Sequence, residues 1–136
     1  MAIVFDYRRE RINGETIYRP VANVILISGI NRVLIYPYID AGADLTLLPR
    51  SIGEALNLRI SHLPIEELSG VGEGKVPVIK KRLKMKISDE IFEAEIAWAL
   101  IEEVPPLLGR KNVFEHFEIT FKEWDRKVIF VPSSKR

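Results

Sequence analysis

Residues 38–49 read YIDAGADLTLLP, and this stretch decides how the rest of the chain is interpreted. An apolar run typical of a strand, residues 33–36, leads toward Asp40, and small residues follow this acid. A buried carboxylate is costly unless it is hydrogen-bonded, and Gly42, which has no Cβ, lets backbone amides come close to it. The stretch therefore predicts a strand that carries an acid into a tight turn. An acid that only caps a helix beginning at Pro49 is the alternative that these residues alone leave open.

Two later segments narrow the choice. Residues 105–112 read PPLLGRKN, which is an apolar strand followed by a glycine, a basic residue and a predicted short helix over 110–116. Residues 69–75 read SGVGEGK, a glycine-dense tip between two strand-like runs that suits a mobile hairpin. Each pattern is common by itself. The three in this order, with Asp40 first, are considerably more specific.

In this order the three segments resemble the retroviral-type (retropepsin-like) aspartic proteases. The resemblance spans about residues 20–131 and leaves a hairpin at about residues 1–20 as an addition. It implies an all-β, closed β-barrel-like acid-protease domain with one or two short helices. Because the chain is too short for two lobes and has one such motif, the resemblance implies a homodimer with one copy of Asp40 from each subunit. The two carboxyls would share a proton and activate a water that hydrolyses a peptide bond.

The resemblance also implies supporting roles, without any cofactor or metal. A flap over residues 70–74 would close over an extended peptide or protein substrate. Asp44 would pair with Arg110, as a structural clamp rather than a catalytic pair. The residues expected to contact substrate are Gly42, Ala43, Asp44, Gly70, Val71 and Gly72. The expected apolar walls are Ile35, Val71, Val76, Ile79 and Leu107.

Ala41 departs from the pattern, since the family has threonine or serine after the catalytic acid. Those hydroxyls bond across the dimer axis in the family, and losing a typical hydrogen bond costs about 0.5–1.5 kcal/mol. Two functions therefore stay open. The chain is an aspartic endopeptidase, or it is a weakened or inactive dimerisation and peptide-binding module on the same scaffold.

The rest of the chain is predicted to be strands within one domain, residues 1–136. Asn13-Gly14 favours a type I′ hairpin between residues 7–12 and 15–18. Further hairpins are predicted for residues 21–27 with 32–39, 83–87 with 92–100, and 117–121 with 127–131, because apolar and polar residues alternate there. A short helix is predicted after Pro49, and a frayed tail over 132–136.

Composition excludes several other classes of protein. The 136 residues carry a net charge of +1 and no cysteine, so disulfides, thiolate zinc sites and cysteine nucleophiles are ruled out. The sequence shows neither a signal peptide nor an apolar run of about 20 residues, which predicts a cytoplasmic protein without membrane contact. Lys80, Arg82, Lys84 and Lys86 form a basic strand face without aromatic residues, so no nucleic acid is expected there. His62 and His116 lack the spacing of a metal site.

Overall fold

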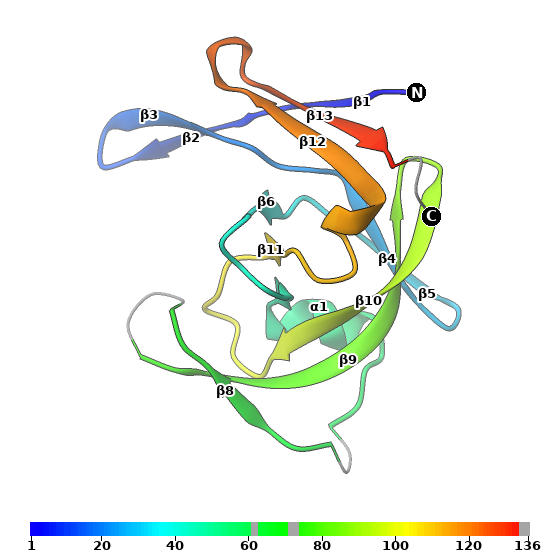
Figure 1. The fold of residues 1–136 in the computed structure, drawn as a ribbon. Coiled ribbons are helices and arrows are strands. Elements are labelled where there is room, and N and C mark those ends of the chain that lie inside the picture. Colours follow the sequence, from blue (N-terminus) through cyan, green and yellow to red (C-terminus); the bar gives the residue numbers. More distant parts are fainter. Residues whose placement is uncertain (61–62, 71–73, 134–136) are drawn as a thin grey trace.

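The chain is folded mainly into β-strands around one curved sheet. The structure, a computed structural model, describes residues 1–60, 63–70 and 74–133. Within these residues the large sheet has the strand order β5-β4-β9-β10-β7-β11-β6, with β8 alongside β9 (Figure 1). Its strands are β4 (Val24–Ser28), β5 (Asn31–Ile35), β6 (Tyr38–Ile39), β7 (Thr46–Leu48), β8 (Glu66–Leu68), β9 (Val76–Ile87), β10 (Glu90–Ala99) and β11 (Leu107–Leu108). The all-β class predicted from the sequence is confirmed.

The antiparallel pair β9–β10 is the longest element of the sheet and curves around the core (Figure 1). Its register runs from Ile87 opposite Glu90 to Val78 opposite Ala99, which confirms the predicted hairpin. From Leu83 to Ile87 the alternating apolar side chains of β9 are buried, while Arg82 and Lys84 are exposed. Arg82 lies opposite an acidic partner, Glu95, across the strand pair. The basic face is therefore compensated in part by acidic neighbours.

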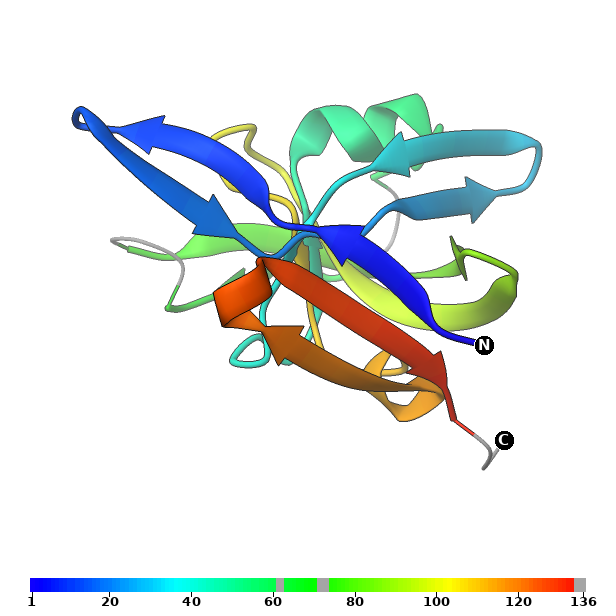
Figure 2. The same ribbon diagram turned by 90° about the horizontal axis from the view of Figure 1, so that it is seen from above.

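Two further sheets complete the domain. A three-stranded sheet has the order β1-β13-β12. The β2–β3 hairpin projects away from the body and is the blue hairpin at the upper left of Figure 2. In that hairpin Asn13 and Gly14 have φ values of 51° and 79°, as the predicted type I′ turn requires. The strand β1 was not predicted, and it pairs with β13 along the whole of its length. These strands are β1 (Ile3–Asp6), β2 (Arg8–Ile12), β3 (Glu15–Arg19), β12 (Phe117–Lys122) and β13 (Lys127–Pro132).

The last strand extends further than the sequence predicts. Pro132 is the final residue of β13, and the Ser133 N–H donates to the carbonyl of His116 (2.7 Å). The predicted tail therefore begins with two residues that are held by backbone pairing. Its remaining residues, 134–136, lie outside the described residues.

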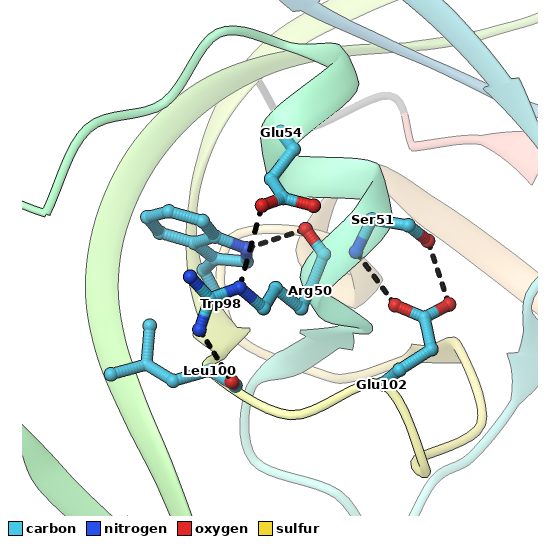
Figure 3. Close-up of polar contacts among 6 residues, drawn as sticks. All are labelled: Arg50, Ser51, Glu54, Trp98, Leu100 and Glu102. Carbon is cyan, nitrogen blue, oxygen red and sulfur yellow. Dashed lines mark hydrogen bonds and ion pairs between the residues drawn. The ribbon is translucent and has the colours of Figure 1, made fainter.

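The predicted helix after Pro49 is present as α1 (Arg50–Ala55), with Pro49 at its N-cap position. Trp98 in β10 attaches this helix to the sheet, because its Nε1–H donates to the Arg50 carbonyl (3.1 Å; Figure 3). Gly53 faces the same indole, and an ideal Cβ on it would lie 2.0 Å from Trp98 Nε1. Only a glycine lets the helix come this close to the sheet.

Glu102 holds the first turn of α1 from outside the helix. Its Oε1 accepts from the Ser51 N–H (2.8 Å), and its Oε2 accepts from the Ser51 hydroxyl (2.7 Å; Figure 3). These bonds lower the pKa of Glu102 below its usual value. The contact ties the helix to the segment that leads into β11, next to the candidate site.

The helix predicted over 110–116 is wrong for most of its length. Residues 111–113 form a turn, and only a single 3₁₀ turn, η1 (Phe114–His116), follows. Asn112 has a φ of 62°, in the left-handed region, so a right-handed helix cannot run through it. Its side-chain Oδ1 instead accepts from the Glu95 N–H (3.0 Å). A second 3₁₀ turn, η2 (Glu123–Asp125), links β12 to β13.

None of the helices in the described ranges has the length and apolar character that crossing a bilayer would require.

Candidate active site

Asp40 lies directly after β6, where short strands from distant parts of the chain meet. Strand β11 pairs in parallel with β6 and in antiparallel with β7, so it separates the two strands that flank Asp40. The Asp40 N–H donates to the carbonyl of Leu108 in β11 (3.0 Å). This backbone bond fixes where the carboxyl group leaves the sheet.

The turn after Asp40 holds its side chain as predicted. The Gly42 N–H donates to Asp40 Oδ1 (2.9 Å), and a Cβ on Gly42 would lie 3.3 Å from that oxygen. The side chain is half-buried. The alternative, in which this acid caps the helix after Pro49, is wrong, because α1 has no side-chain cap.

A buried hydrogen bond between β7 and the end of β11 was not predicted. Thr46 in β7 is completely buried, and its Oγ1 accepts from the Gly109 N–H (3.1 Å). A Cβ on Gly109 would lie 2.3 Å from the backbone carbon of Leu45, so β7 and the end of β11 touch through this glycine. The glycine at the end of PPLLG was recognised in the sequence, whereas nothing marked Thr46 as its partner.

An open cleft of about 660 Å³ extends from Asp40. The turn residues Gly42, Ala43 and Asp44 line it, and Gly70 lines it from the far end of the β8 segment. Val71 and Gly72, the other predicted flap contacts, lie outside the described residues. The remaining lining residues are Leu45, Leu47, Glu66, Leu68, Ser69, Lys80, Glu95, Pro105, Leu107 and Lys111.

Two ion pairs make the cleft more polar than predicted. Lys111 Nζ lies 2.7 Å from Glu95 Oε1, and Lys80 Nζ lies 3.3 Å from Glu66 Oε1. The hydrogen bond from Lys111 lowers the pKa of Glu95. No sequence pattern indicated the Lys111–Glu95 pair, because the two residues come from different parts of the fold.

The predicted apolar walls are only partly correct. Leu107 lines the cleft, but Ile35, Val76 and Ile79 are buried, with 5%, 4% and 0% of their surface exposed. They pack into the two hydrophobic clusters of the core instead. Val76 and Ile79 are three residues apart in β9, so they point to opposite faces of the strand, and each face packs into one of the two clusters.

The backbones of the predicted Asp44–Arg110 clamp lie side by side. The Arg110 N–H donates to the Ala43 carbonyl (3.0 Å), and the Lys111 N–H donates to the Asp44 carbonyl (2.8 Å). Both residues line a hollow separate from this cleft. Among the ion pairs of the described residues, none joins Asp44 to Arg110.

No group of three or more His, Cys, Asp or Glu side chains in the described ranges is arranged to hold a metal ion. His116 stacks on Phe92, with 4.4 Å between ring centroids. His62 lies outside the described residues.

Comparison with known proteins finds matches in structure and none in sequence. Neither a protein-family model nor a curated protein matches the chain. A retropepsin-like aspartic protease from Rickettsia conorii superimposes with a TM-score of 0.65 and 20% identity, over 96% of this chain and 89% of that one.

Two other solved structures are also similar. The EIAV protease in complex with the inhibitor HBY-793 matches with a TM-score of 0.56 and 24% identity, over 71% of this chain and 86% of that one. The retroviral protease-like domain of Ddi1 from Leishmania major matches with a TM-score of 0.56 and 12% identity, over 87% and 98% of the two chains. Together with the strand arrangement around Asp40, these similarities establish that the chain has the retropepsin-like aspartic protease fold.

Proposed function

We propose that the protein is an aspartic endopeptidase whose active site forms when two copies of the chain bring their Asp40 side chains together. The observation that carries the proposal is the position of Asp40. A half-buried carboxyl, held by the Gly42 N–H, opens onto a cleft in a retropepsin-like fold. The sequence has one such motif, so the second carboxyl has to come from another copy.

The chemistry follows from the proximity of two acids. Two carboxylates about 3 Å apart cannot both ionise cheaply, so the pair holds one proton between them. The charged member takes a proton from a water, which attacks the peptide carbonyl, and the protonated member donates to the carbonyl oxygen. Gly42, Ala43 and Asp44 would hold the extended substrate backbone, with Gly70, Val71 and Gly72 over it. The proton affinities belong to the pair and not to either residue.

Ala41 supports a second candidate function. This residue is exposed and has no hydroxyl to bond across a dimer axis. A scaffold that dimerises and binds peptides without cleaving them is therefore the alternative.

Cleavage of an unstructured peptide library between about pH 4 and 7 tests both candidates. The original protein is compared with Asp40→Asn, which keeps the size of the side chain but cannot supply the charged member. Cleavage that disappears in Asp40→Asn supports the endopeptidase. Cleavage that appears only in Ala41→Thr supports the inactive scaffold.

Sedimentation over a range of concentrations gives the second measurement. An active dimer requires the specific rate to rise with the fraction of dimer. A protein that cleaves while it stays monomeric at every concentration contradicts the proposed dyad, because one chain supplies only one Asp40 carboxyl.

A further inference from the structure

A second hollow, of about 420 Å³, lies beside Asp40 and is bounded by the added N-terminal hairpin. Glu10 and Ile12 of β2, together with Arg19 at the end of β3, form the wall contributed by the hairpin. Leu107 lines both this hollow and the cleft described above. The two cavities therefore adjoin on either side of Asp40, and a peptide that passes over the carboxyl would reach both.

The polar end of this second hollow is a compact charged cluster. Tyr38, two residues before Asp40, donates its hydroxyl to Glu10 Oε2. Arg19 Nε lies 3.2 Å from Glu10 Oε1, and Arg8 Nη1 lies 3.8 Å from Glu10 Oε2. The guanidinium carbons of Arg8 and Arg19 lie 5.3 and 5.7 Å from the centre of the Tyr38 ring. The hairpin is thus attached to β6, the strand that directly precedes Asp40.

The charge of the cluster favours an anion. Both oxygens of Glu10 already have partners, and only 19% of its side chain is exposed, so it has little capacity left for a cationic ligand. Within the cluster, two guanidinium groups against one carboxylate leave a net charge of +1, and the Asp40 carboxyl is the other acidic group that lines the hollow. Arg8 also donates to the Tyr36 carbonyl (2.9 Å), whereas the terminal nitrogens of Arg19 have no protein partner among the described residues. Arg19 is 45% exposed and lines the hollow, so its free donors are accessible.

We propose that the second hollow binds an acidic side chain of the peptide substrate, with Arg19 as the residue that recognises it. A guanidinium matches a carboxylate in both charge and geometry. Glutamate fits better than aspartate, because its two methylene groups can lie along Ile12 and Leu107 while the carboxylate reaches Arg19. This inference rests on the proposed function and names the side chain that the site selects.

The test uses matched peptides that carry glutamate, glutamine or lysine at each position around the cleaved bond. At one position the original protein is expected to prefer glutamate over glutamine by about fivefold in kcat/KM, the size of a half-exposed ion pair. Arg19→Gln should abolish this preference, and Arg19→Glu should shift it toward lysine. Arg11→Glu is the matched control for Arg19→Glu, since it changes the net charge of the same hairpin by the same amount at a residue that is not part of the lining of the hollow. It should keep the preference for glutamate.

A binding measurement separates this inference from the proposed function. The same peptides, labelled with a fluorophore, are titrated into Asp40→Asn with and without the Arg19 substitutions, and fluorescence anisotropy is recorded. Absence of cleavage by the original protein would contradict the endopeptidase only, because the glutamate preference can still be read in binding. The subsite would be overturned if Arg19→Gln kept the same preference for glutamate over glutamine peptides, both in kcat/KM and in affinity. Equal loss of this preference in Arg11→Glu would overturn it as well, because net charge would then be the cause.

Discussion

Gly109→Ala should destabilise the protein more than any glycine substitution at an open turn. An ideal Cβ at this position would lie 2.3 Å from the Leu45 backbone carbon, 2.4 Å from its oxygen and 2.7 Å from the Thr46 nitrogen. Ordinary contact begins at 3.4 Å, so the two chain segments must separate by about 1 Å. The φ of Gly109 lies outside the left-handed region, so an alanine meets no backbone strain and the cost is steric.

The size of the effect follows from what this separation breaks. Overpacking against backbone costs about 1–3 kcal/mol. Moving the strands apart by about 1 Å also breaks the buried 3.1 Å hydrogen bond from the Gly109 N–H to Thr46 Oγ1, worth about 1–3 kcal/mol. We expect a loss of about 2–6 kcal/mol in the free energy of unfolding. With an unfolding entropy of about 2.1 cal/mol/K per residue, a loss of 3 kcal/mol lowers the Tm by about 10 °C.

Urea unfolding followed by circular dichroism measures this loss, and Gly29→Ala is the matched control. Gly29 has a φ of +58° and no heavy atom within 4 Å of its ideal Cβ, so its substitution adds backbone strain without a clash. That strain should cost about 1–2 kcal/mol. If Gly109→Ala is no less stable than Gly29→Ala, the segments of β7 and β11 are not packed as closely at Gly109 as these distances indicate.

Three other substitutions test individual side chains. Thr46→Val keeps the shape of the side chain but removes the oxygen that accepts from the Gly109 N–H. Urea unfolding should show a loss of about 1–3 kcal/mol in the free energy of unfolding. An unchanged free energy would contradict a stabilising role for this hydrogen bond. Glu95 has a lowered pKa, so the stability it adds is present above its ordinary pKa of 4.5 and disappears as the pH falls through the lower folded value. The difference in the free energy of unfolding between the original protein and Glu95→Gln should therefore shrink as the pH falls. A constant difference from pH 3 to 7 would contradict this. Burial, with a hydrogen bond to Glu123, raises the pKa of Tyr7 from 10.0 to about 12. The folded protein should lose stability between those pH values as the unfolded chain ionises, and Tyr7→Phe should not show this loss.

The sequence predicted elements that depend on neighbouring residues and missed those that depend on distant ones. Alternation along β9 and β10, and the Asn13-Gly14 turn, are local patterns, and the structure confirms both hairpins. The parallel pairs β10–β7 and β11–β6 join segments far apart in the chain, and each is only two or three residues long. Strands of that length carry too few residues to show a periodicity.

The same distinction applies to the candidate site. The turn after Asp40 was predictable because Gly42 is two residues away. The charged lining of the cleft was not, since Lys111 reaches Glu95 from a turn that the left-handed conformation of Asn112 creates. Helix propensity over 110–116 gave no indication of this conformation. An asparagine is among the few residues that adopt it readily, and that was the one available signal.

The geometry of the Asp40 carboxyl meets the requirements of the proposed dyad. Within the described residues, its Oδ1 accepts one hydrogen bond from Gly42, and no bond reaches Oδ2. Asp40 also lines the open cleft, so its carboxyl is accessible from that side. A turn that holds the acid through one oxygen, from the backbone of Gly42, keeps the side chain in place without enclosing it. The proposed dyad requires both properties, because a second carboxyl and a water must reach the same group.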